Sequence, residues 1–222
     1  MKRVVMQLMR SIVTVIVVGT MACMIFSLRG ELAETKAKTR AAAVAAKGEP
    51  GLFETIAART SVRKFDPSRP VSDAEVEKIL RAAMCAPSAM NRQPWEFVVV
   101  RDRAQLDELA RLNPNSRIGN GATVAICVCG KLDNGLNGRG KEFWIHDCSA
   151  ASMNILLAAK GLGLGTVWTG VYPIAERIAA VRGTLKIPEG YMPLNLIPIG
   201  RPAENPPPKD KWTPAKVHHD RW

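Results

Sequence analysis

The segment from residue 85 to residue 100, CAPSAMNRQPWEFVVV, restricts the possible folds of this chain more than any other stretch. It begins at the end of an expected helix, passes through a polar loop between Pro87 and Pro94, and continues into a β-branched run. Because the two prolines limit backbone motion, the short side chains of Ser88 and Asn91 are offered in restricted positions. The segment therefore predicts a helix, a binding loop and a strand in direct succession.

The helix that leads to this loop has a clear signature at its N-terminus. Ser72 and Glu75 form an S-x-x-E capping box, and apolar residues follow at helical spacing until Pro87 ends the helix. Periodicity predicts further helices at 52–57, 102–112, 142–159 and 173–181. It predicts strands at 95–100, 122–130 and 192–199, of which the second is almost wholly apolar and is expected at the centre of its sheet.

Two further segments have the chemistry of an anion site and a ring site. Arg59, Ser61 and Arg63 form an R-x-S-x-R pattern, in which two guanidiniums and a hydroxyl can surround a phosphate. The same pattern is also typical of a solvated charge run. Glycines at 161, 163 and 165 allow a tight reversal that brings residues 168–170 against a flat ring. These glycines follow an expected helix. In a dinucleotide-binding turn the order is reversed, because the glycines follow a strand and precede a helix.

Four segments, taken in chain order, together resemble the FMN-dependent nitroreductase family. They are RTSVRKF at 59–65, APSAMNRQPW at 86–95, GLGLGTVWTG at 161–170 and IPIGRP at 197–202. The resemblance implies an α+β fold, a nitroreductase-like three-layer sandwich in which helices flank a mostly antiparallel mixed sheet. It further implies a domain-interlocked homodimer with FMN at the subunit interface.

The resemblance also implies which residues hold the cofactor. The R-x-S-x-R segment and the G-R turn after the last strand are expected at the FMN phosphate and ribityl chain. The central loop and residues 168–170 are expected at the flavin ring, and Gln93 is expected to brace the loop. The expected cofactor-binding residues are Arg59, Thr60, Ser61, Arg63, Pro87, Ser88, Asn91, Trp168, Thr169, Gly170, Gly200 and Arg201.

The expected function is that of an FMN-dependent oxidoreductase of the nitroreductase type. No side chain stands out as a nucleophile, general base or metal ligand, which suits an enzyme whose flavin carries the chemistry. The resemblance implies ping-pong hydride transfer from a reduced donor such as NAD(P)H, through flavin N5, to a nitroaromatic, quinone or similar small-molecule acceptor. The alternatives are a specialised flavin reaction such as reductive dehalogenation, and a membrane-tethered flavin-binding module without turnover.

The two ends of the chain differ from the expected domain at 51–203. Residues 1–28 include an uncharged run from Ser11 to Leu28, near the lower length limit of a transmembrane helix, which predicts a signal anchor or a cleaved signal peptide. Residues 29–50 are expected to form a tether. The catalytic domain is therefore expected to be membrane-anchored or exported, outside the cytoplasm, with the cytoplasmic face as the alternative. Residues 204–222 are expected to extend over a partner subunit.

Composition argues against several other functions. The formal net charge of +11 suits an anionic ligand, but no basic stripe interleaved with aromatics indicates nucleic-acid binding. The five cysteines lack paired spacing, so neither a disulfide framework nor a zinc site is expected. Cys127 and Cys129 lie two apart in an expected strand and should face the core together. His218 and His219 have no further ligands near them in sequence, so no metal is expected.

Overall fold

The computed structural model describes residues 51–134 and 138–222. The expected signal anchor at 1–28 and the tether at 29–50 lie outside these residues. Among the helices of the described ranges, none is long and apolar enough to cross a bilayer.

The helices and strands lie close to the positions predicted from periodicity. The helices are α2 (Leu52–Ala58), α3 (Asp73–Met84), α4 (Arg103–Leu112), α5 (Phe143–Gly161) and α6 (Ala175–Leu185). The strands are β1 (Phe65–Asp66), β2 (Trp95–Val100), β3 (Val124–Lys131), β4 (Gly165–Thr166), β5 (Thr169–Gly170) and β6 (Tyr191–Pro202). Short 3-10 turns are η1 (Ala89–Asn91), η2 (Pro114–Ser116), η3 (Leu132–Asn134), η4 (Gly138–Gly140) and η5 (Pro214–Lys216).

The predicted capping box at the start of α3 is confirmed. The Ser72 hydroxyl accepts a hydrogen bond from the Glu75 N–H at 3.3 Å, and the Glu75 carboxylate accepts one from the Ser72 N–H at 2.9 Å. Two otherwise unpaired backbone donors are thus satisfied at the helix N-terminus. The helix then ends at Met84, three residues before Pro87, and delivers the chain to the polar loop.

The sheet is organised around β3 and β6. Its strand order is β1-β6-β3-β2, and β4 and β5 pair with further parts of β6. All pairings among the described strands are antiparallel, so the expected mixed character is not seen within them. Strand β3 has two neighbours and is buried along nearly its whole length, as its apolar sequence predicted.

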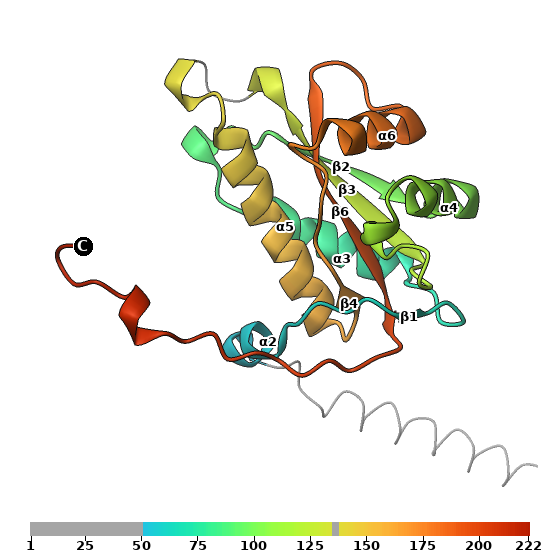
Figure 1. The fold of residues 1–222 in the computed structure, drawn as a ribbon, viewed down its shortest axis with the longest axis horizontal. Coiled ribbons are helices and arrows are strands. Elements are labelled where there is room, and N and C mark those ends of the chain that lie inside the picture. Colours follow the sequence, from blue (N-terminus) through green and yellow to red (C-terminus); the bar gives the residue numbers. More distant parts are fainter. Residues whose placement is uncertain (1–50, 135–137) are drawn as a thin grey trace, which may run out of the picture. The chain divides into compact units, whose positions relative to one another are not determined.

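Helices cover both faces of this sheet, as Figure 1 shows for α3 and α5 on one side and α4 and α6 on the other. Alternate residues of β3 serve the two layers. Ile126 packs in the cluster that contains Ile155 of α5, whereas Cys127 packs in the cluster that contains Leu106 of α4. The three-layer α+β sandwich is therefore confirmed. The buried thiols of Cys127 and Cys129 lie 3.7 Å apart on one face, as predicted.

Two helices differ in how they bury their apolar residues. Helix α5 is apolar on nearly every side and is largely buried, as expected. It also buries Asp147, which the sequence did not single out. In α2, Leu52 and Phe53 are 67% and 85% exposed, so the apolar face of this helix is not covered by the described chain.

Candidate functional site

The R-x-S-x-R segment is held in an extended conformation between α2 and β1. The buried Val62 donates its N–H to a β4 carbonyl at 2.9 Å. The Asn120 side chain donates to the Arg63 carbonyl at 2.8 Å, and the Glu204 carboxylate accepts from the Arg63 N–H at 2.5 Å. Because three separate parts of the chain hold the backbone, the side chains on either side of Val62 are presented in defined directions.

These side chains line an open cavity with a volume of about 600 Å³. Arg59, Thr60, Ser61 and Arg63, which the resemblance implies at the FMN phosphate and ribityl chain, all contribute to it. The remaining lining residues are Ile56, Ala57, Met153, Pro206, Pro207, Lys209 and Lys211. Four cationic side chains and two hydroxyls around one cavity are a donor set that suits a phosphate group.

The sequence did not single out Lys209 and Lys211. They follow the proline run at 206–208, which cannot form a sheet ladder and instead leads the chain past the R-x-S-x-R segment. The sequence signal that could have drawn attention to them is their position directly after this proline run. Without the fold, nothing in the sequence placed them near Arg59.

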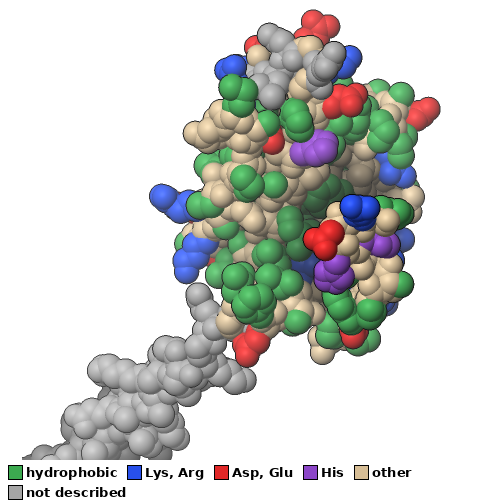
Figure 2. All heavy atoms as spheres, turned by 90° about the vertical axis from the view of Figure 1, so that its left-hand side faces the viewer, with side chains coloured by type: hydrophobic (Ala, Val, Ile, Leu, Met, Phe, Trp, Pro, Cys, Tyr) green, Lys and Arg blue, Asp and Glu red, His purple; other side chains and the backbone are tan. Residues whose placement is uncertain are grey.

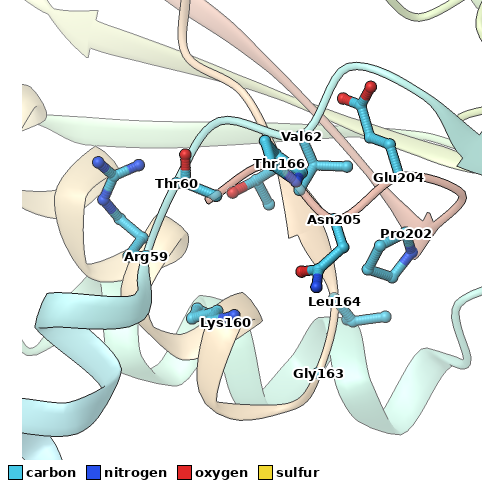
Figure 3. Close-up of a pocket in the computed structure, with 11 residues that line it drawn as sticks. Arg59, Thr60, Val62, Lys160, Gly163, Leu164, Thr166, Pro202, Glu204 and Asn205 are labelled. Atoms are coloured by element: carbon cyan, nitrogen blue, oxygen red, sulfur yellow. The ribbon is translucent and has the colours of Figure 1, made fainter. Parts of the chain in front are cut away.

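A second, much smaller cavity lies beside the same segment (Figure 3). Its volume is about 60 Å³, and its lining includes Lys160, Thr166, Glu204 and Asn205. In Figure 3 the Arg59 guanidinium points away from Glu204 and Asn205. This space is enough for a few water molecules and is too small for a ring system.

The polar loop of Pro87, Ser88 and Asn91 lies at the other end of α5 from this cavity (Figure 1). The loop is fixed there because Asp147 Oδ1 accepts a hydrogen bond from the Ala89 N–H at 2.9 Å. Lys160, beside Arg59 in the small cavity, follows Asp147 by 13 residues on the same helix, which corresponds to about 20 Å. One protomer therefore keeps the loop and the R-x-S-x-R segment apart.

Within the loop, Gln93 acts as the expected brace. Its side-chain amide donates to Asn91 Oδ1 at 2.8 Å, and its N–H donates to Ser88 Oγ at 2.9 Å. Pro87 and Asn91 are exposed, and Ser88 is half-buried. The loop thus presents polar groups to its surroundings from a braced backbone.

The segment of Trp168, Thr169 and Gly170 runs along β6, between the two regions. Thr166 pairs with Ile199 and Thr169 pairs with Leu196, so the strand register separates them by about 10 Å. Trp168 is 37% exposed, whereas Thr169 is buried. The Gly170 carbonyl accepts a hydrogen bond from Arg177 of α6 at 3.0 Å, which orients the local backbone.

Gly200 and Arg201 have protein partners rather than a place in the large cavity. A Cβ at Gly200 would meet the Phe65 Cβ at 2.9 Å, so glycine permits the close approach of β1 to β6. The Arg201 guanidinium forms an ion pair with Glu75 of α3 at 2.9 Å, with both side chains partly buried. The structure therefore differs from the expectation that Arg201 joins Arg59 at a phosphate, because its side chain extends toward α3.

This ion pair changes the acidity of Glu75. Burial alone would raise the pKa of this carboxyl, but the hydrogen bonds from Ser72 and the positive charge of Arg201 outweigh burial and leave the pKa lowered. Glu75 is therefore ionised at neutral pH and completes both the helix cap and the pair with β6.

The described chain is an α+β sandwich with four cationic side chains among the residues that line a large cavity, and with a separate, braced polar loop. A family model described as "Nitroreductase family" matches residues 56–116 and 111–201. The chain belongs to the nitroreductase family.

Individual relatives agree with this assignment. The chain is 45% identical over 171 residues to a "Putative NADH dehydrogenase/NAD(P)H nitroreductase" from Methanothermobacter thermautotrophicus, covering 77% of this chain and 87% of the relative. A solved structure with the same description, from Parabacteroides distasonis, has a TM-score of 0.73 and 45% identity, covering 78% of this chain and all of the other. A putative nitroreductase from Desulfovibrio desulfuricans, solved in complex with FMN, has a TM-score of 0.66 and 30% identity, covering 78% and 99% of the two chains.

Proposed function

We propose that this protein is an FMN-dependent oxidoreductase that takes reducing equivalents from NAD(P)H and passes them to a small-molecule acceptor such as a nitroaromatic or a quinone. The observation that carries the proposal is the cavity in which Arg59, Arg63, Lys209 and Lys211 surround Ser61 and Thr60. The names of two relatives point in the same direction, since one is described as an NAD(P)H nitroreductase and another is a nitroreductase solved in complex with FMN.

The chain's own residues bind and orient the cofactor. The guanidiniums of Arg59 and Arg63 and the hydroxyl of Ser61 donate to the phosphate, and Lys209 and Lys211 add positive charge from the C-terminal segment. Asn91 and the backbone near Thr169 orient the ring. FMN held by these residues would supply the hydride-transfer chemistry.

The proposal requires a homodimer, with FMN at the interface between the two subunits. The loop of Ser88 and Asn91 and the segment of Arg59 lie at opposite ends of α5, so a second copy is needed to bring one loop to the other copy's cations. Figure 2 shows hydrophobic side chains exposed on the face of the domain that lies at the left in Figure 1, where α5 and the C-terminal extension are. The large apolar side chains that are exposed on α2 and on the C-terminal extension are Leu52, Phe53, Ile56, Trp212, Val217 and Trp222. A second copy of the chain is the occupant that would cover them.

Flavin content and reduction test the function directly. The purified protein should bind FMN at one molecule per chain, and its visible absorbance should bleach under anaerobic NADPH or NADH and return when a quinone or nitroaromatic is added. Initial rates measured against both substrates should give the parallel double-reciprocal lines of a ping-pong mechanism. A protein that takes up no added FMN contradicts the proposal, and a bound flavin that no donor bleaches indicates a binding module without turnover.

We further propose that residues 1–28 anchor the domain in a membrane or export it. Support comes from the uncharged run between Ser11 and Leu28. A reporter fused after Val44 should reach the outer side of the membrane. A reporter that stays in the cytoplasm would overturn the outward orientation. It would also give the domain access to NAD(P)H, a cytoplasmic reductant that an outward-facing domain would not meet.

A further inference from the structure

The polar loop has a backbone conformation that its own residues do not favour. Met90, Asn91 and Gln93 have φ values of 49°, 53° and 50°. These values lie in the left-handed region, which asparagine tolerates but which Met90 and Gln93 do not favour, because Cβ approaches the neighbouring carbonyl. Three such residues within four positions persist only where other contacts hold them.

Some of these contacts lie within the loop. The Ser88 carbonyl accepts a hydrogen bond from the Asn91 N–H at 3.0 Å, and Ser88 Oγ accepts one from the Gln93 N–H at 2.9 Å. The Gln93 side chain then donates to Asn91 Oδ1 at 2.8 Å. These bonds join loop residues to one another, so they define the shape of the loop but not its position on the domain.

The contact with Asp147 ties the loop to α5. Asp147 Oδ1 accepts a hydrogen bond from the Ala89 N–H at 2.9 Å, directly before the three left-handed residues. The Asp147 side chain is only 6% exposed, and the neighbouring Cys148 and Ala151 belong to the apolar core. A buried carboxylate loses favourable hydration, so its burial in this layer must be compensated by a hydrogen bond. The charge-assisted hydrogen bond to the loop backbone provides this compensation.

We propose that Asp147 is a positioning residue that holds the loop so that Ser88 and Asn91 meet the flavin ring. The effect on the ring rests on the proposed function, whereas the hold on Ala89 does not. Helix α5 is the most deeply packed helix of its layer, so Asp147 ties a strained loop to a rigid support. Replacing the carboxylate should release the loop without removing any group that touches the cofactor.

Amide hydrogen exchange on the FMN-free protein tests the hold itself. In Asp147→Ala, the amides of residues 89–93 should exchange at least about tenfold faster than in the wild type, since the loop loses its tie to α5. Asp147→Asn keeps an acceptor oxygen and should restore slow exchange. Asn154→Ala is the matched control, because Asn154 ties the same helix to the Ala82 carbonyl of α3 at 2.9 Å without touching the loop.

FMN titration and the visible spectrum test the consequence. Asp147→Ala should bind FMN at least about tenfold more weakly and shift the absorption bands of the bound flavin, since the ring loses an ordered contact surface. Asp147→Asn should lie within about threefold of the wild type, and Asn154→Ala should match it. Ala89→Pro removes the same hydrogen bond from the loop side and should reproduce Asp147→Ala. The extended backbone of Ser88 (φ −138°, ψ 153°) accepts a following proline, so this variant also serves if Asp147→Ala does not fold.

Unchanged exchange at residues 89–93 in Asp147→Ala, and at residues 90–93 in Ala89→Pro, in which residue 89 has no amide hydrogen, would overturn the proposal. So would an Asn154→Ala variant that loses as much loop protection and FMN affinity as Asp147→Ala, because the effect would then be general destabilisation. A wild-type protein that binds no FMN would instead refute the proposed function. The exchange data would still decide whether Asp147 holds the loop.

Discussion

Two variants that each lose FMN binding should recover it when their chains are paired. In the proposed dimer, each site takes its phosphate ligands from one chain and its polar loop from the other, because the two lie about 20 Å apart along α5 within one protomer. Arg59→Ala removes a charge-assisted hydrogen bond from one half of the site, and Asn91→Ala removes a ring contact from the other half. Each homodimer should bind FMN about tenfold or more weakly, from about 1.5–3 kcal/mol for a hydrogen bond to a charged group.

A heterodimer of the two variants contains one site with both defects and one site with none. Random pairing gives heterodimers in half of the dimers, so about a quarter of all sites should bind FMN with wild-type affinity. Isolating the heterodimer through two different affinity tags raises that share to one site in two. Titration of flavin fluorescence would resolve this tight class of sites from the weak class.

The matched control places both substitutions on one chain and pairs it with a wild-type chain. A site shared between subunits then has one defect in each of its two copies, and no tight class remains. A site built within one chain gives the opposite pattern, with one intact site in this control and none in the first heterodimer. Observing that opposite pattern would refute the shared site.

Three further substitutions have consequences that follow from single contacts. Glu75→Gln keeps an acceptor for the helix cap but removes the charge opposite Arg201, and urea unfolding at pH 7 should show a loss of about 1 kcal/mol. Gly200→Ala should cost about 1–3 kcal/mol and lower the melting temperature, because its Cβ would lie 2.9 Å from the Phe65 Cβ. Lys211→Ala should weaken FMN binding several-fold and reduce the dependence of that binding on salt concentration, measured by titration in rising NaCl.

The Glu75→Gln loss should depend on pH in one direction. The folded-state pKa of Glu75 lies below its ordinary value, so its ionised form contributes stability at pH values above the unfolded-state pKa. This contribution disappears as the pH falls through the folded-state pKa. The wild type and the variant should therefore converge in acid, and a difference that grows on acidification would contradict the assignment. For Lys211→Ala the control is Lys78→Ala on the exposed face of α3, which should leave FMN binding unchanged.

Local signals predicted the elements that position the site. The capping box of Ser72 and Glu75 placed the start of α3, and the β-branched run placed β2 at Trp95–Val100. These signals work because helix caps and strand alternation involve residues only a few positions apart. The three residues of the R-x-S-x-R pattern likewise line one cavity together with Thr60, since neighbours in an extended segment remain neighbours in space.

Other features depended on contacts between distant parts of the chain. The role of Arg201 could not be deduced from its place after the last strand, because its partner Glu75 lies 126 residues earlier. The same holds for Lys209 and Lys211, which reach the cavity only after the proline run passes the R-x-S-x-R segment. The contact of Asp147 with the loop could not be deduced either, because Ala89, which donates the hydrogen bond, lies 58 residues earlier.

The sequence alone determined the succession of helices and strands, the polar loop between two prolines, and the family to which the chain is related. It could do so because capping, periodicity and proline geometry act over a few residues. The tertiary structure decided which cationic side chains line one cavity, which arginine is paired with a glutamate, and how far the loop lies from the R-x-S-x-R segment. Those outcomes depend on the packing of α3 and α5 against the sheet. There, residues far apart in the chain contact one another instead of water.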